Sequence, residues 1–455
     1  MRFGAVMAAL ALVATGCSSE RSKDDAGDTG KDSGGDTTTE AASFGDLPSP
    51  CGPGDASGAT DQGVTDKQIV IGYGDDRGYA AAPGLNQELG DAVTAMIAWC
   101  NEQGGINGRE VVGKQYDAAL TNAATVMQKA CKETFMLVGE GFAYDEAAEQ
   151  FRVGCDLPAV AGFIVGPNAS MGPNAFSAVP LPVDYFNGQP MALAAETFPA
   201  FKDNMDFLGS NSPAVAASRI RADAAFEKIG ITPKDCGVSL NSEGDASYVP
   251  FAEKFKKCGI EALWSSNSPN ASQFGMLEAN KRIGLDLQYV YEATWYNPIV
   301  TDYNKKSGAA DGMASAIVFQ PFENADVVPA VQDYLDAVDA SGGKTGLLGM
   351  QATSAFLLWA TAAKECGDDL TRDCVVEQLS GVHDWTAGGL HAPTDPGGNK
   401  PTDCALLVQL EGDTWTQIAP EEQGEFSCNP DMVLEIDPKL SGVTLDDNRH
   451  STAFQ

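Results

Sequence analysis

The segment most suggestive of chemistry is GYGDDRG, residues 72–78, which follows a β-rich run. It is close to a dinucleotide-binding turn, but the third glycine of the G-x-G-x-x-G pattern falls on Arg77, so the spacing fails. Asp75 and Asp76 offer a pair of carboxylates for acid–base chemistry. Adjacent residues at a strand end usually point to opposite sides, whereas a catalytic pair must face one another. We therefore expect these carboxylates to line a surface or cleft.

Other catalytic signatures are missing from the sequence. It has no G-x-S-x-G elbow, no H-E-x-x-H helix and no P-loop. His383 and His391 lie in a stretch rich in glycine and proline, and nothing around them supports a catalytic role. We predict no catalytic residue, no cofactor and no metal, and hence a protein that is not an enzyme.

Ten cysteines follow Cys17, an even number that predicts five disulfides in an exported chain. A zinc site is disfavoured because the chain has no C-x-x-C pair and only scattered histidines. Sequence alone does not fix the connectivity, but local context ranks the pairs. Two pairs precede β-rich runs that would be parallel neighbours, two bracket turns, and the fifth takes the remaining cysteines. The predicted pairs are Cys51–Cys100, Cys131–Cys155, Cys236–Cys258, Cys366–Cys374 and Cys404–Cys428.

Charge narrows the classes of partner. The 455 residues carry 63 acidic and 29 basic side chains, a formal net charge of −34. A nucleic-acid-binding protein needs a basic face, and attraction to an anionic membrane needs the same. Both partners are therefore excluded as charge-driven interactions.

The N-terminus reads as a targeting segment. Arg2 precedes an apolar run at residues 3–15, which is too short to remain as a membrane span. The run leads into ATGC, and this resembles the lipobox of bacterial lipoproteins, in which the cysteine, here Cys17, is lipidated and becomes the N-terminus. An ordinary secretory signal is the alternative, and both readings export the protein. Residues 18–50 are rich in Asp, Gly, Ser and Thr, which predicts a disordered acidic tether.

The rest of the chain alternates β-rich runs with amphipathic helices in two successive series. This pattern predicts α/β architecture with two doubly wound lobes. We expect strands at 67–74, 109–117, 135–141, 157–163, 175–182, 205–211, 236–241, 260–267, 288–293 and 312–322, and a hairpin at 404–419. We expect helices at 89–103, 122–134, 145–154, 189–201, 215–230, 249–257, 273–284, 328–340, 350–365 and 370–380.

The segment WCNEQGGINGREVV, residues 99–112, predicts a tight connection between a helix and the next strand. Gly104 or Gly105 supplies the left-handed residue that ends the helix, and Ile106 folds back on the last turn. Asn107-Gly108 then turns the chain into the strand.

Three features carry a family resemblance: GVTDKQIVIG at 63–72, NEQGGINGREV at 101–111, and the two α/β series. Together they resemble the substrate-binding proteins of ABC importers, in the type I periplasmic binding protein family that includes leucine/isoleucine/valine-binding proteins. The resemblance covers roughly residues 64–428. It implies two Rossmann-like lobes joined by a hinge of three crossing strands, with a solute held between them. It also implies a monomer, anchored by its lipid outside the cell membrane, that delivers a small organic solute to ABC permease subunits.

The resemblance implies a domain division and a set of residues at the ends of strands. The lobes would be 51–183 with 311–400 and 184–310 with 401–428, followed by an acidic tail at 429–455. The expected cleft residues are Asp75, Asp76, Gly141, Phe142, Gly162, Phe163, Asn211, Asn267, Glu292, Trp295 and Tyr296.

The sequence departs from the amino-acid binders of that family at three of its positions. Ala143 stands where those proteins use a hydroxyl for the ligand's carboxylate, and Ala293, next to Glu292, stands where they use a glutamate. Asn267 replaces a tyrosine that covers the ligand. The aromatic residues among the cleft candidates suggest an aromatic or short-chain acid or amide as solute, although each could equally be core packing. A ligand-sensing module that reports to a membrane partner, or a purely structural surface lipoprotein, are the alternative functions.

Overall fold

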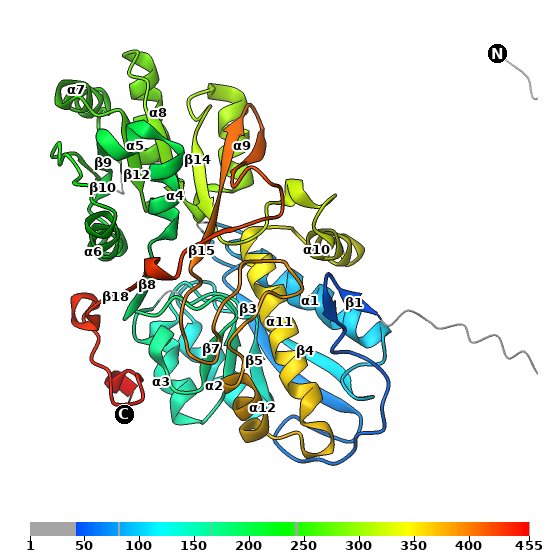
Figure 1. Cartoon of the computed structure of the whole chain (residues 1–455). Helices are drawn as coiled ribbons and strands as arrows, with labels where there is room; N and C mark the ends of the chain where they lie inside the picture. Colours follow the sequence, from blue (N-terminus) through cyan, green and yellow to red (C-terminus); the bar gives the residue numbers. More distant parts are fainter. Residues whose placement is uncertain (1–41, 81, 165, 242–243, 455) are drawn as a thin grey trace, which may run out of the picture. The chain divides into compact units, whose positions relative to one another are not determined.

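The computed structural model describes residues 42–80, 82–164, 166–241 and 244–454 (Figure 1). They form two α/β lobes, each built on its own largely parallel sheet, as predicted. The signal segment, Cys17 and the tether as far as residue 41 lie outside the described residues. Within the described residues, no helix is long and apolar enough to cross a membrane.

The first lobe is built on a five-stranded parallel sheet with the order β4-β3-β5-β6-β7. Its strands are β3 (Gln68–Asp75), β4 (Glu110–Asp117), β5 (Met136–Val138), β6 (Ala159–Ala161) and β7 (Ala175–Ser177). Two helix groups supply its core. One consists of α1 (Gln87–Glu102), α10 (Pro329–Ala340), α11 (Leu347–Glu365) and α12 (Arg372–Ser380), and the other of α2 (Ala123–Glu133) and α3 (Glu146–Gly154). α10 to α12 come from the second half of the chain, so the first lobe is complete only after the chain has returned from the second lobe.

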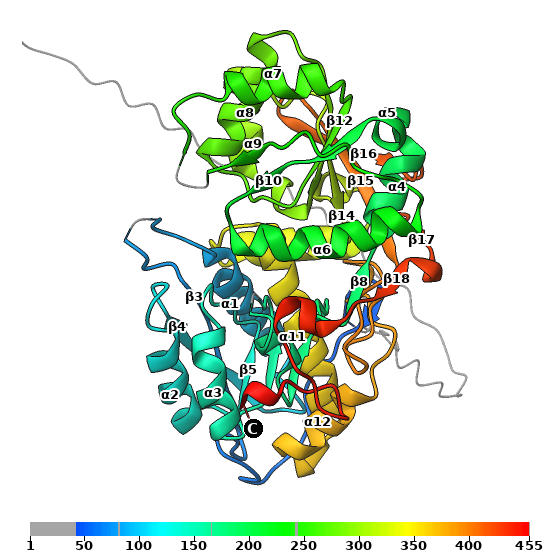
Figure 2. The same ribbon diagram turned by 90° about the vertical axis from the view of Figure 1, so that its left-hand side faces the viewer.

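The second lobe has the sheet order β16-β15-β14-β13-β12-β9, with β15 and β16 antiparallel to their neighbours. Its strands are β9 (Met205–Phe207), β10 (Gly209–Ser210), β11 (Ser239–Leu240), β12 (Ala262–Ser265), β13 (Gln288–Glu292), β14 (Ala314–Ile317), β15 (Cys404–Glu411), β16 (Thr414–Ala419) and β17 (Ser427–Cys428). Its helices are α4 (Gln189–Thr197), α5 (Pro199–Asp203), α6 (Pro213–Lys228), α7 (Val249–Cys258), α8 (Ala271–Arg282) and α9 (Pro298–Ser307). Figure 2 shows α7 to α9 and α4 to α6 on opposite faces of this sheet, and each group packs its own hydrophobic core.

The corner after α1 forms as predicted. Gly104 and Gly105 have φ of 109° and 75°, and the Gly105 N–H donates to the Cys100 carbonyl. A side chain at Gly105 would meet the Arg109 carbonyl oxygen at 2.0 Å, so glycine is required there. Ile106 is 1% exposed and pairs with Arg109, which starts the turn into β4.

All five predicted cysteine pairs are disulfides in the structure. They are Cys51–Cys100, Cys131–Cys155, Cys236–Cys258, Cys366–Cys374 and Cys404–Cys428. Cys131 and Cys155 precede β5 and β6, which pair in parallel and start at the same edge of the first sheet. Cys236 and Cys258 precede β11 and β12, which are not paired: β11 belongs to a separate two-stranded sheet with β10.

Residues 42–50 differ from the expected tether. β1 (Ser43–Phe44) and β2 (Leu47–Pro48) form a small hairpin against the first lobe. The Phe44 ring is buried and lies edge-on to Trp99, with centroids 5.8 Å apart. The Gly45 N–H donates to Asp333 Oδ2 at 2.7 Å. The buried ring and these main-chain hydrogen bonds hold a segment whose composition is otherwise that of a coil.

The boundaries between the lobes also differ from the expected ones. β14 pairs with β13, so the chain returns to the first lobe after Ile317 and not near residue 311. α9 was not predicted. The predicted acidic tail is folded: β18 (Val433–Glu435) pairs with β8 (Tyr185–Asn187), and Arg449 forms an ion pair with Asp184 at 2.7 Å. The tail therefore returns to residues that lie just before the second lobe begins.

Candidate functional site

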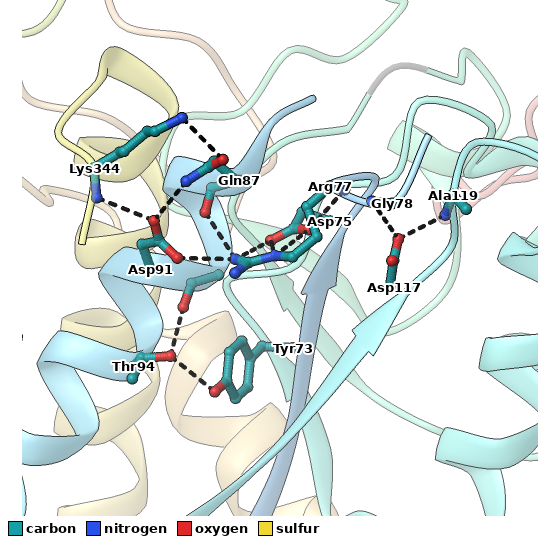
Figure 3. A network of polar contacts seen from close by, with 11 residues as sticks. Tyr73, Asp75, Arg77, Gly78, Gln87, Asp91, Thr94, Asp117, Ala119 and Lys344 are labelled. Carbon is teal, nitrogen blue, oxygen red and sulfur yellow. Dashed lines mark hydrogen bonds and ion pairs between the residues drawn. The ribbon is translucent and has the colours of Figure 1, made fainter. Parts of the chain in front are cut away.

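The carboxyl end of β3 carries a polar network that joins three segments of the first lobe (Figure 3). The Arg77 guanidinium contacts Asp75 through Nε at 2.9 Å and Nη2 at 2.6 Å, and Nη2 also reaches Asp91 at 3.0 Å and the Gln87 carbonyl at 3.0 Å. Burial raises the pKa of Asp75, and its bonds to Arg77 oppose that shift. The same bonds to Asp75 raise the pKa of Arg77. The network holds the β3–α1 loop against α1.

Lys344 connects this network to the loop before α11. Its main-chain N–H donates to Asp91 at 3.0 Å and its ammonium donates to Gln87 Oε1 at 3.0 Å. Figure 3 shows Asp91 between Arg77 and Lys344. Segments more than 250 residues apart in sequence thus meet at one edge of the sheet, and the sequence pattern gave no sign of this junction.

Asp76 points the other way and closes two loops. Its side chain is fully buried, and its two oxygens each accept a main-chain N–H at 2.7 Å, one from Leu120 and one from Ala143. These two N–H groups follow β4 and β5. Asp75 and Asp76 thus accept from different partners, and both are fully buried, so they do not line an open surface as the sequence suggested.

Other acidic side chains close the remaining loops at this edge in the same way. Asp117 Oδ1 accepts from the N–H groups of Gly78 at 3.1 Å and Ala119 at 2.9 Å. Asp145 accepts from Gly166 N–H at 2.9 Å. The carboxyl edge of the first sheet is thus built from carboxylates that bind the chain's own amides.

Glu140 is the exception among these acids. It is 7% exposed, and its Oε2 atom is buried with no hydrogen-bond partner among the described residues. It lines a cavity of about 30 Å³ together with Phe163 and the buried ion pair between Glu149 and Arg152. That volume is enough for a water molecule. Burial raises the pKa of Glu140 to about 7, opposed by the nearby Arg152 guanidinium.

The carboxyl edge of the second sheet is held mainly by neutral groups. Asn267 is 4% exposed and donates through Nδ2 to the Leu208 carbonyl and the Ser265 hydroxyl, both at 3.0 Å. The main-chain carbonyl of Asn267 accepts a hydrogen bond from Trp295 Nε1 at 2.6 Å. These bonds fix the loops after β9, β12 and β13 relative to one another.

One charged cluster lies at this second edge. Glu292 accepts a short hydrogen bond from the Ser266 hydroxyl. Burial raises the pKa of Glu292, and the bond from Ser266 and the charge of Arg221 oppose the shift. Burial lowers the pKa of Arg221, opposed by Glu292, and Arg221 Nε is buried without a hydrogen-bond partner in the described chain. Each of these two charges thus favours the ionised form of the other.

The structure places most of the predicted aromatic residues in the core beneath the two edges. Phe142 is 3% exposed among residues of α2 and α3, Trp295 is 0% exposed, and Tyr296 is 4% exposed with its hydroxyl bonded to Glu323. Phe163 is partly buried and lines two cavities. Tyr144, which the sequence analysis did not select, is 54% exposed in the loop after β5.

The remaining predicted residues lie in loops at the two edges. Gly141 and Gly162 follow β5 and β6, and a side chain at Gly162 would meet the Gly139 carbonyl oxygen at 2.8 Å. Asn211 is exposed after β10 and donates through Nδ2 to Asn241 at 3.2 Å. The structure thus groups the predicted residues on two edges but turns many of their side chains inward.

Two other groups of side chains in the described residues are close enough to suggest a catalytic or metal site, but their surroundings do not support one. Ser354 and His391 are 2.8 Å apart, but both side chains are buried and the Ser354 hydroxyl accepts from Trp385 Nε1. Burial lowers the pKa of His391 to about 4, so it is neutral at pH 7. Asp403 lies close to Cys404 and Cys428, but the two sulfurs are joined in a disulfide and are not free to bind a metal.

A family model described as "Periplasmic binding protein" matches residues 68–414, which span both sheets. Among curated proteins, no sequence matches this chain.

Three solved structures illustrate the similarity of fold. A solute-binding protein of an ABC transporter from R. palustris, in complex with 4-hydroxybenzoate, has a TM-score of 0.61 and 14% identity, covering 80% of this chain and 98% of that one. A branched-chain amino acid ABC transporter protein from Thermus thermophilus, with bound valine, has a TM-score of 0.60 and 13% identity, with coverages of 80% and 98%. A fatty acid ABC transporter substrate-binding protein from Thermomonospora curvata has a TM-score of 0.61 and 13% identity, with coverages of 86% and 96%. At these identities the likeness establishes the type of fold.

Proposed function

Because the chain belongs to the periplasmic binding protein family, we propose that it captures a small organic solute between its two lobes and delivers it to an ABC importer. The observation that carries the proposal is the extent of the family match, which covers both sheets and the segments between them. The matching family and the structural relatives are binding and transport proteins, not enzymes.

The proposed contacts are the loops at the carboxyl edges of the two sheets. Open parallel sheets bind ligands at this edge, and hinge closure of two lobes buries a ligand. The solute-facing candidates in the first lobe are Gly141, Tyr144, Gly162 and Phe163, and Asn211 is the candidate in the second lobe. Phe142, Trp295 and Tyr296 support these loops from below, and Asp75, Asp76, Asn267 and Glu292 hold their shape.

The proposal includes export and a lipid anchor. The apolar run before Cys17 and its lipobox-like context support diacylation of this cysteine. A monomer held by its lipid to the outer face of the cell membrane would meet permease subunits within reach of its tether. Replacing Cys17 with alanine should abolish incorporation of a radiolabelled fatty acid and release the protein from the membrane fraction. Persistent labelling of the Cys17→Ala variant would rule out this anchor.

The binding function is tested by a thermal-shift screen of oxidised residues 18–455 against amino acids, aromatic acids, amides, amines, polyols and purines. A ligand at a hundredfold excess over its Kd adds about 2.7 kcal/mol to the free energy of unfolding, a rise of a few degrees in Tm. Deletion of the gene should then abolish uptake of the solute identified. Saturable binding with unchanged uptake would favour the sensing module, and a flat screen of folded protein would contradict solute capture.

A further inference from the structure

In the described loops of the first lobe, seven main-chain N–H groups that could receive an anion are already used. Exposed main-chain N–H groups at strand-to-helix junctions attract carboxylates and phosphates. Here those N–H groups already donate to the chain's own acids, with Asp75, Asp76, Asp117, Asp145 and Glu146 as acceptors. The donors are the main-chain N–H groups of Arg77, Gly78, Ala119, Leu120, Ala143, Gly166 and Ala169.

Asp76 shows how firmly these main-chain N–H groups are held by the chain's own acids. Both of its oxygens are used at 2.7 Å, and the carboxylate is fully buried. The Ala143 N–H would be the natural donor to a solute's carboxylate in the loop after β5. Such a solute would have to displace an internal carboxylate that already binds two amides.

The cations at this edge also have partners in the chain, and the Lys344 ammonium donates to Gln87 Oε1 at 3.0 Å. The Arg77 guanidinium binds Asp75, Asp91 and the Gln87 carbonyl. The Arg152 guanidinium binds Glu149 and two main-chain carbonyls. Acidic side chains outnumber basic ones here, and in the part of the chain described Asp76 and Asp117 accept from main-chain N–H groups and form no ion pair. The electrostatic potential at this edge therefore disfavours an anion and favours a cation.

An exposed aromatic ring stands at the same place. Tyr144 follows Ala143 directly and is 54% exposed, so its ring is open to solvent at this edge. The face of an aromatic ring attracts a cation, and the attraction grows as water is excluded. Closure of a lobe over this loop would exclude water from the Tyr144 ring.

We infer that the solute presents a positively charged nitrogen group, an ammonium or amidinium, to the first lobe at Tyr144, and not a carboxylate. This inference rests on the proposed function and narrows its solute class. It removes the acids from the solutes suggested by the sequence. Arg221 belongs to the second lobe, where the charge of Glu292 acts on its pKa against the effect of burial.

The test compares solutes that share a hydrocarbon skeleton and differ in the charge of their polar group. Isothermal titration calorimetry at low ionic strength would use benzamidine, benzamide and benzoate, and also isoamylamine, isocaproamide and isocaproate. The cationic member of a set that binds should do so at least tenfold more tightly than the carboxylate. If none of these six binds, the charge of the tightest solute from the thermal-shift screen decides in the same way.

Variants at the surface locate the charged group. Tyr144→Ala should weaken binding of the cation about five- to tenfold, whereas Tyr144→Phe keeps the ring and should leave the affinity nearly unchanged. Leu440→Ala is the matched control, because Leu440 is also 54% exposed but lies in the C-terminal tail. Both sites are exposed, so all three variants should fold.

The outcomes separate the inference from the function on which it rests. A carboxylate or neutral amide that binds as tightly as the cation, or a Tyr144→Ala variant with full affinity, would overturn the inference while solute capture stands. A folded protein that binds no solute in the whole screen would overturn both.

Discussion

The loops at the carboxyl edge of the first sheet are held by carboxylates, whereas those at the same edge of the second sheet are held by amides and hydroxyls. In the first lobe Asp76 joins two loops through main-chain N–H groups. In the second lobe Asn267 joins its loops, and Asn270 and Asn297 cap α8 and α9. The same β–loop–α unit is thus fixed with charge in one lobe and almost without charge in the other.

The ion pairs follow the same division. The first lobe has the pair between Glu149 and Arg152, whose side chains are 7% and 3% exposed. The described pair between Lys305 and Asp413 in the second lobe is open to solvent. Since a buried charge depends on its partner and an exposed one is served by water, the first lobe should be the more sensitive to loss of a charge and to pH.

The largest effect should come from Arg152→Ala. It leaves Glu149 buried without a partner and two main-chain carbonyls, of Leu157 and Pro173, without their donor. Chemical denaturation should show a loss of roughly 3–5 kcal/mol in the free energy of unfolding. The double variant Glu149→Leu, Arg152→Met should recover most of that loss. If the Arg152→Ala variant were as stable as the wild type, burial of the Glu149 carboxylate would not depend on its ion pair with Arg152.

A smaller loss should follow Asp76→Ala, which leaves two amides without an acceptor. Two charge-assisted hydrogen bonds predict a decrease of about 3–4 kcal/mol, whereas Asn267→Ala, which removes neutral bonds, should cost about 1–2 kcal/mol. Asp76→Asn should recover about half, because its single carbonyl oxygen still accepts from one amide. Equal losses for Asp76→Ala and Asn267→Ala in denaturation curves would remove the contrast between the lobes.

Glu140 makes the first lobe sensitive to pH. Its pKa is raised by burial to about 7 from the ordinary value of 4.5, so the folded state binds its proton more tightly than the unfolded state. The stabilisation is complete below about pH 4.5 and is lost as the pH rises to 7. Relative to wild type, Glu140→Gln should therefore gain stability on raising the pH from 5 to 8, by roughly 3 kcal/mol at most. Parallel stability–pH curves for the two proteins would contradict this assignment.

The smallest effect is expected at the surface of the second lobe. Lys305 and Asp413 are 2.8 Å apart but exposed, so Lys305→Ala should leave the denaturation midpoint unchanged within error. A marked loss would mean that exposure does not distinguish the ion pairs of the two lobes.

The sequence by itself determined the family and most of the secondary structure. Alternating strands and amphipathic helices are local patterns, and they predicted both sheets and the connection at Gly104–Gly108. The five cysteine pairs were also predicted, although the expected parallel neighbours are found only at Cys131–Cys155, since β11 and β12 after Cys236 and Cys258 lie in different sheets. α9 was not predicted because it lies in a stretch without a clear helical pattern. The folded tail was not predicted because β18 pairs with β8, which lies about 250 residues away in the sequence.

Only the tertiary structure decided which way the side chains at the strand ends point. Phe142 and Trp295 follow strands just as Tyr144 does, yet the first two are buried in the core and the third is exposed. Likewise, nothing near Asp76 in sequence shows that it accepts from Leu120 and Ala143. The position where a strand ends follows from the alternation of apolar and polar residues along that strand. The direction of a loop side chain depends instead on which distant backbone groups need a hydrogen-bond partner. The fold could therefore be predicted from the sequence, whereas the polar contacts at the carboxyl edges of the two sheets depend on loops that meet only in the tertiary structure.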